Sequence, residues 1–310
     1  MTASGRAMAA HSVRAFPNRQ RRIEALMGAG FALPALALLF LTILAPLGVL
    51  TWLSLSDYQL GAVDIRFVGL ANFHKAFADP VLRRALGNTL LYVAIVLPGS
   101  VALALVVAML IHRRKRSRSF YEVIYFLPVT STLIAMATVW QFMLHPRIGP
   151  VNGVLRELGF PTMPFLTEPA LVLPTLAMIG IWQLIGFNMV LFLAGLSAIP
   201  REIQEAAEVD GCVSPIDRFV QIIWPLLGPT TMFVIVTTSI TAFKIFDTVA
   251  VLTRGGPMGS SQVLLYATYL EAFQYFNMGY AAALTFIFLT FIVVFSIVQT
   301  FVLDRRVHYR

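Results

Sequence analysis

Two ionisable side chains, Lys244 and Asp247, interrupt a long apolar run in the second half of the chain. In a continuous helix, residues three apart would share one face. A lysine near the centre of a bilayer costs roughly 2.5 to 3.5 kcal/mol on insertion scales, so it needs a partner or a wet cavity. Two interpretations stay open. Either Lys244 extends outward and pairs with Asp247 as a structural contact, or the two residues edge a water-filled translocation path.

A second set of candidate residues, Trp182, Gln183 and Asn188, lies in another apolar run. Amide groups and aromatic faces are what a hydroxyl-rich solute needs for recognition. The alternative is that these side chains bond to a neighbouring transmembrane helix. We therefore treat them as candidates for the same translocation path.

Motifs for bond-making chemistry are missing from the sequence. It contains no Gly-x-x-x-x-Gly-Lys-Ser/Thr loop for nucleotide phosphates, no His-Glu-x-x-His metal helix and no Gly-x-Ser-x-Gly elbow. The 5 histidines lie in tails or at the ends of apolar runs, and the single cysteine excludes an internal disulfide. We expect no catalytic residue, no metal and no cofactor, and we expect the energy for any transport to come from a partner.

Composition places these residues in a membrane protein. Hydrophobic residues make up 58% of the chain and charged residues 12%, with a mean hydropathy of +0.79. A helix needs about 20 residues to cross a hydrocarbon layer of roughly 30 Å. The sequence therefore predicts an all-α, polytopic membrane protein with six transmembrane helices. Their expected ranges are 31–55, 88–111, 121–144, 171–195, 230–253 and 280–302.

Basic residues at the ends of the apolar runs predict the orientation. With the N-terminus in the cytoplasm, fifteen Lys and Arg residues fall on that side and eight on the other. The positive-inside rule then places both termini in the cytoplasm. The basic run 113–118 lies between two spans, which favours a topology anchor over a nucleic-acid site. The expected organisation is a cytoplasmic tail (1–30), a first helix (31–55), a core with five further helices (56–303) and a cytoplasmic tail (304–310).

A polar stretch, residues 197–225, interrupts the apolar half of the chain. Ser197 as cap, Pro200 in the first turn and Gly211 in the left-handed conformation predict one short helix. Ser214 as cap and Pro215 at the first position predict a second. Helical spacing places Ile199, Ile203, Ala206 and Ala207 on one face of the first helix, with Glu202, Glu205 and Glu208 elsewhere. From spacing alone, this is an ordinary cytoplasmic loop with two capped turns.

The same stretch resembles the EAA loop of the permease subunits of bacterial ATP-binding-cassette importers. The matching residues are Glu205, Ala206, Ala207, Asp210, Gly211, Phe219, Ile222 and Pro225. It departs from the family pattern at Cys212, where Ala is usual, and at Trp224, where Leu is usual. In that family the loop forms coupling helices that sit in a cleft of the ATPase subunit. The resemblance implies an ATPase-coupling surface made of Glu205, Ala206, Ala207, Asp210, Gly211 and Pro225.

Three further stretches, within 67–73, 118–155 and 255–283, are similar to carbohydrate permeases of the maltose and glycerol-3-phosphate type. The resemblance implies a MetI-like core in the bacterial inner membrane that imports a sugar or sugar-like solute by alternating access. It also implies a second, related permease subunit, two ATPase subunits that use the ATP, and an external solute-binding protein. Membrane lipid is an expected partner and nucleic acid is not.

A stand-alone secondary carrier or channel is the alternative from another class. Such a protein would need an internal repeat or a self-contained ion site. The sequence shows neither feature, which favours the importer subunit.

Overall fold

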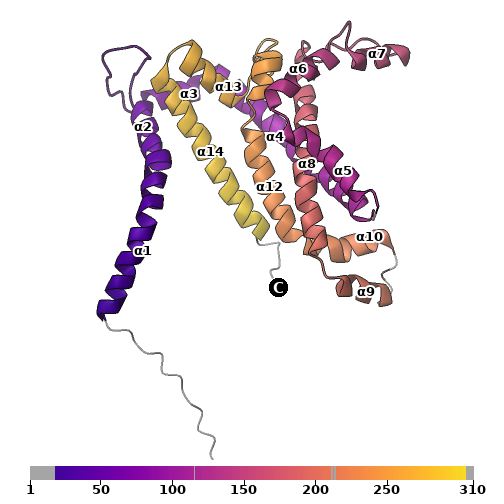
Figure 1. The fold of residues 1–310 in the computed structure, drawn as a ribbon. Coiled ribbons are helices and arrows are strands. Elements are labelled where there is room, and N and C mark those ends of the chain that lie inside the picture. The colour runs from indigo at the N-terminus through magenta and orange to yellow at the C-terminus, as the bar shows by residue number, and fades with distance from the viewer. Residues whose placement is uncertain (1–17, 115, 211, 213, 305–310) are drawn as a thin grey trace, which may run out of the picture. The chain divides into compact units, whose positions relative to one another are not determined.

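The computed structural model describes residues 18–114, 116–210, 212 and 214–304 (Figure 1). Within these residues the regular structure is helical, and the β-pairing is limited to one isolated bridge between Ser56 and Phe67. The chain divides into two compact units, residues 1–52 and 53–310, which are described separately.

The first unit is a single apolar helical segment. It comprises α1 (Asn18–Leu39), a π-helical turn η1 (Phe40–Leu44) and most of α2 (Ala45–Ser54). The stretch Leu26–Ser54 is long and apolar enough to cross a membrane. Large apolar side chains point outward all along it, for example Phe31 and Leu41. A helix that is hydrophobic all round belongs in lipid, which confirms the first predicted span.

Three further long helices in the second unit agree with predicted spans. They are α4 (Pro80–His112), α8 (Pro169–Ser197) and α14 (Met278–Asp304). The α4 helix begins eight residues before its predicted start because Asp79 caps it. The Asp79 Oδ1 atom accepts a hydrogen bond from the Val81 N–H at 2.8 Å, and Pro80 occupies the first helical position.

The predicted third span, 121–144, is not one continuous helix. It consists of α5 (Arg118–Thr130) and α6 (Leu133–Met143), which are bent by 99° relative to each other. The hydroxyls of Thr130 and Ser131 donate to the Leu127 carbonyl, at 2.8 and 3.5 Å. Such local side-chain bonds offer the backbone an alternative to helix, and the chain turns at this point.

The predicted fifth span, 230–253, begins within two residues of its predicted start but is wrong at its far end. Its α12 helix (Gly228–Phe243) is bent by 70° from a preceding segment made of α10 (Pro215–Arg218), η2 (Phe219–Ile223) and α11 (Trp224–Leu226). It stops at Phe243, residues 244–246 are not helical, and a π-helical turn η3 (Val249–Thr253) follows. In the described residues of the two units, four helices are long and apolar enough to span a membrane, and counting each bent pair as one span gives the six that the sequence predicts.

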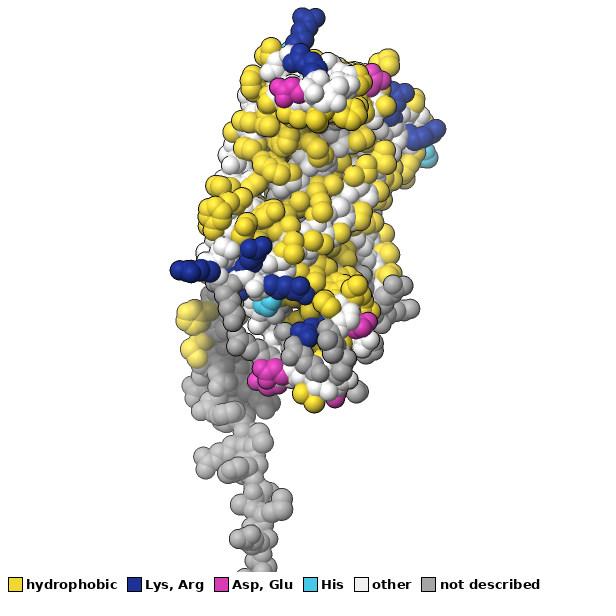
Figure 2. Space-filling model, turned by 90° about the vertical axis from the view of Figure 1, so that its right-hand side faces the viewer, with side chains coloured by type: hydrophobic (Ala, Val, Ile, Leu, Met, Phe, Trp, Pro, Cys, Tyr) yellow, Lys and Arg dark blue, Asp and Glu magenta, His cyan; other side chains and the backbone are white. Residues whose placement is uncertain are grey.

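Short helices occupy both ends of the second unit. At one end lie α3 (Ala71–Ala78), α6, α7 (Pro150–Glu157) and α13 (Leu264–Tyr269), which continues into η4 (Leu270–Gln274). At the other end lie α9 (Arg201–Val209) and α10. Figure 2 shows a broad hydrophobic band on one face between these polar ends. This is the surface expected of a protein that spans a membrane.

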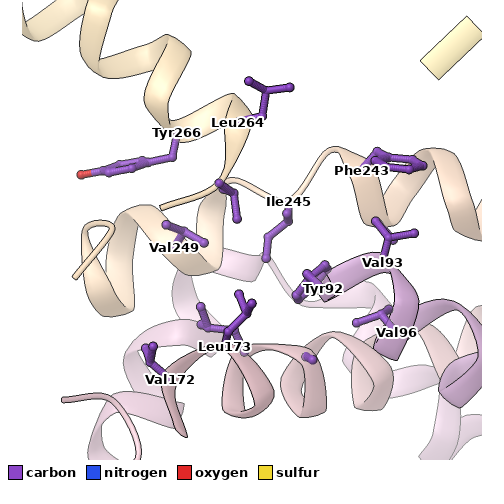
Figure 3. Packing of buried hydrophobic residues seen from close by; sticks show 14 of the residues in the cluster. Tyr92, Val93, Val96, Val172, Leu173, Phe243, Ile245, Val249, Leu264 and Tyr266 are labelled. Carbon is purple, nitrogen blue, oxygen red and sulfur yellow. The ribbon is translucent and has the colours of Figure 1, made fainter. Parts of the chain in front are cut away.

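The core of the second unit forms where α4 and α8 pack along each other. Tyr92 and Val96 of α4 and Leu173 of α8 belong to this core, and Phe243 and Ile245 join it from the end of α12 (Figure 3). A second buried cluster lies toward α9 and includes Phe192, Leu196, Ile199 and Leu227. The two clusters fix the end of α12 at one level and the start of α9 at the other.

Candidate functional site

A cavity of about 220 Å³ lies where α12 ends. Four separate parts of the chain line it. They are α4 through Tyr92, the start of α6 through Leu133, α8 through Gly180, Gln183 and Leu184, and residues 241, 242 and 244–248. The cavity therefore combines aromatic, amide and ionisable side chains within an apolar bundle.

The helix break supplies the polar part of this cavity. The Lys244 N–H still bonds to the Ile240 and Thr241 carbonyls, at 3.3 and 3.2 Å, but Ile245 and Phe246 leave the helix. Non-helical backbone at membrane depth is tolerated only where it is buried in protein or lines a water-filled space. The break, the cavity and the two charges therefore belong to one feature.

Lys244 and Asp247 do not share a helical face, because the helix between them is interrupted. Both side chains line the cavity, with Lys244 exposed and Asp247 half-buried. Among the described side chains, neither residue forms an ion pair within 4 Å. The structural salt bridge considered from the sequence is thus not formed, and both charges are available to the cavity.

The other three candidates, Gln183, Trp182 and Asn188, lie in different environments in the structure. Gln183 lines the cavity. Trp182 instead packs edge-on against Trp140 of α6, with ring centroids 5.4 Å apart. Asn188 is 1% exposed, and its Oδ1 atom accepts a hydrogen bond from the Thr238 hydroxyl at 3.1 Å. Asn188 therefore connects α8 to α12, and the helix-to-helix interpretation applies to it.

Sequence reasoning missed the aromatic side chains beside the cavity. Phe246 lines it, and the Phe246 ring centroid lies 5.3 Å from that of Tyr269, which lies 5.4 Å from Phe273. Tyr266 stacks on Tyr269 at 6.1 Å. Burial raises the pKa of the Tyr266 phenol above its ordinary value. The concentration of aromatic residues in 266–276 is the sequence signal that could have identified this aromatic cluster.

At the opposite end, α9 begins later than predicted. Ser197 is the last residue of α8 and does not cap α9, since its hydroxyl donates to the Leu193 carbonyl at 2.7 Å. Pro200 precedes the first helical residue, Arg201. The second predicted start is confirmed, because Pro215 opens α10 and the Ser214 Oγ atom accepts from the Ile216 N–H at 3.3 Å.

The backbone hydrogen bonds at the end of α9 form a helix-capping pattern. The Cys212 N–H donates to the Ala207 carbonyl at 2.9 Å, and the Asp210 N–H to the Ala206 carbonyl at 2.9 Å. A bond that spans six residues is the outer bond of a Schellman cap. Gly211 lies outside the described residues, so its left-handed conformation stays a prediction.

The small residues of α9 do not form one exposed face. Ala207 is 9% exposed and belongs to the interior of the protein, whereas Glu205, Ala206 and Asp210 are exposed. Pro225 is exposed in α11. The surface that α9 offers to another molecule therefore centres on Glu205 and Ala206.

Up to six spans, a polar cavity at a helix break and an amphipathic helix at one end are the features of a polytopic membrane transport protein. The chain belongs to the family of binding-protein-dependent transport system inner membrane components, whose family model matches residues 100–309. It is 33% identical over 261 residues to a probable ABC transporter permease protein of Pyrococcus horikoshii, covering 84% of this chain and 89% of the relative.

Two further comparisons agree with this assignment. The chain is 33% identical over 246 residues to the sn-glycerol-3-phosphate transport system permease protein UgpA of Agrobacterium fabrum, covering 78% of this chain and 83% of the relative. Its fold is similar to a chain of a bacterial alginate ABC transporter solved in complex with an alginate pentasaccharide-bound periplasmic protein. That match has a TM-score of 0.81 at 21% identity and covers 93% of this chain and 96% of the other.

Proposed function

We propose that this chain is the permease subunit of an ATP-binding-cassette importer for a sugar or sugar-like solute, such as glycerol-3-phosphate or a polyol. The observation that carries the proposal is the cavity at the break of α12, which presents an amide, a cation and a carboxylate together. Gln183 and Asp247 suit hydroxyl groups, and Lys244 suits a phosphate or carboxylate. The substrates named for UgpA and for the alginate transporter belong to the same chemical range.

The cavity supports a path shared with a second subunit. Ligand pockets usually measure about 300 to 1,000 Å³, and this one measures about 220 Å³. Half of the path would then belong to a second permease chain, related but not identical. An external solute-binding protein would deliver the solute.

Energy would enter through α9. The sequence has no phosphate-binding loop, so ATP would be hydrolysed by two partner ATPase subunits. Closure of those subunits would move α9, and the spans would change between inward-open and outward-open arrangements. The contribution of this chain is a coupling free energy between the docking surface and the cavity. With fifteen basic residues on that side, both termini and α9 would face the cytoplasm.

The proposal is tested with Asp247→Ala in cells that carry all the importer subunits. We expect the initial uptake of labelled sn-glycerol-3-phosphate or maltose to fall about tenfold, which matches the loss of one charge-assisted hydrogen bond. The amount of assembled subunit in the membrane should not change. Asp64→Ala, an exposed carboxylate outside the cavity, is the matched control and should transport normally.

Two results would contradict the proposal. Normal uptake by Asp247→Ala would show that the cavity is not part of the translocation path. Failure of any ATPase subunit to co-purify with the wild-type chain would instead favour a stand-alone carrier.

A further inference from the structure

Two apolar clefts flank the last two turns of α4. The first, of about 280 Å³, is lined by Val106, Met109 and Leu110 of α4, by Arg113 directly after the helix, and by Pro215, Ile216 and Phe219. The second, of about 140 Å³, is lined by Val107, Leu110 and Ile111 of α4, by Arg114 just beyond the end of the helix, and by Tyr121 and Tyr125 of α5. Leu110 belongs to both, so it forms the ridge between them.

Each cleft runs along the helix from apolar side chains to an arginine. The α4 residues in each follow the spacing i, i+3 and i+4, which defines one stripe on a helix, and the two stripes are neighbours. The arginine of each cleft lies just beyond the end of α4. Leu110 is 61% exposed and Ile216 is 73% exposed. An apolar groove with a cation at its end has the chemistry of an acyl chain that carries a negatively charged headgroup.

The two arginines have no carboxylate partner among the described side chains. Arg118 is held by Glu122 at 2.7 Å, but neither Arg113 nor Arg114 lies within 4 Å of a described acidic group. The Arg114 guanidinium lies 5.8 Å from the ring centroid of Tyr121, which holds this cation at the mouth of the second cleft. Figure 2 shows basic side chains gathered below the hydrophobic band.

We propose that the two clefts bind one anionic phospholipid. One acyl chain lies on each side of Leu110, and the phosphate lies between Arg113 and Arg114. Charge complementarity selects this occupant, because basic side chains at the end of a transmembrane helix attract anionic headgroups. A zwitterionic lipid would bring its own cation to the two arginines and would bind less tightly.

The first test measures lipid binding to the purified full-length chain in detergent by native mass spectrometry. Phosphatidylglycerol should bind more tightly than phosphatidylcholine. Arg113→Gln/Arg114→Gln should weaken phosphatidylglycerol binding by about tenfold to thirtyfold. The control Arg83→Gln/Arg147→Gln removes the same two charges from exposed side chains at the other end of the unit and should not change it. Equal binding of the two lipids, or unchanged binding by the first double variant, would overturn the proposal.

A second variant tests the clefts separately from the charges. Val106→Trp fills the first cleft from a 51% exposed position and keeps both arginines. It should weaken phosphatidylglycerol binding, and millimolar inorganic phosphate should not compete for the wild-type site. Unchanged binding by Val106→Trp, or displacement by phosphate alone, would show a headgroup contact without an acyl site.

The occupant in native membranes is identified with a photo-crosslinking residue at position 106. Crosslinks to lipid are expected. Crosslinks to a protein, including a second copy of this chain, would replace the lipid with a protein interface and overturn the proposal.

Discussion

Asn152 uses its whole amide group to hold the connection between α6 and α8. The side chain is 0% exposed. Its Nδ2 atom donates to the carbonyl of Met163 at 3.1 Å and to those of Leu144 and His145 at 3.4 and 3.5 Å. Its Oδ1 atom accepts from the Met163 N–H at 2.8 Å. One side chain thus satisfies backbone groups on both sides of α7.

Replacing Asn152 with Ala should destabilise this end of the protein. The Met163 N–H would lose its acceptor in a buried site, at a cost of about 1 to 3 kcal/mol. We expect the apparent melting temperature in detergent to fall by several degrees. Gln59→Ala, which removes an exposed amide, is the control and should leave it unchanged. Equal melting temperatures for Asn152→Ala and the wild type would show that water replaces the amide.

At the residue scale, the sequence predicted which polar side chains matter better than it predicted what they contact. Lys244, Asp247 and Gln183 could be selected because each is expensive to place in an apolar run. The same reasoning selected Asn188, yet its amide connects two helices. Hydropathy measures the cost of a polar group in lipid. It does not say whether a neighbouring helix or a cavity removes that cost.

At the scale of elements, the apolar length of each run predicted the spans but not their breaks. α4, α8 and α14 lie where the sequence placed them. The break between α5 and α6 depends on the hydroxyls near residue 130, which compete with the helix for a carbonyl. The end of α12 at Phe243 is not marked by glycine or proline, so apolar length alone placed the end of this span ten residues too late.

The packing of α5 against α8 depends on a close approach at Gly186. A Cβ atom at this position would overlap the Tyr125 carbonyl oxygen of α5, which is backbone and cannot turn away. Gly186→Ala should therefore separate the two helices and lower stability by about 1 to 3 kcal/mol, a typical cost of overpacking. Thermal unfolding in detergent measures the change.

Gly87→Ala is the matched control for this prediction. It lies in α4, where nothing lies within 4 Å of the added carbon. Alanine is the better helix former, so Gly87→Ala should leave stability unchanged or slightly raise it. Equal unfolding temperatures for the two variants would mean that α5 and α8 do not approach closely in the membrane.

At the scale of the whole molecule, the cavity is assembled from parts far apart in the sequence. Residues near 92, 133, 183 and 247 meet there only because α4 and α8 pack together and the end of α12 lies against them. No spacing rule connects these positions. The α9 helix differs, because its residues are contiguous, and the sequence could therefore mark the proposed docking segment as a unit although not its exposed side.

The exposed side of α9 gives the sharpest test of energy coupling. Ala206→Trp adds a large side chain where α9 faces outward, whereas Ala207 is buried in the chain itself. In the complete importer, Ala206→Trp should leave subunit stability unchanged and reduce the ATPase subunit that co-purifies at least tenfold. Solute-stimulated ATP hydrolysis should fall with it, because a steric block at the docking surface stops force transfer.

Ala62→Trp, an exposed site outside α9, controls for the added indole. Ala207→Trp should instead lower stability, by overpacking. If Ala206→Trp kept full co-purification and ATPase stimulation, the partner would contact another part of this chain.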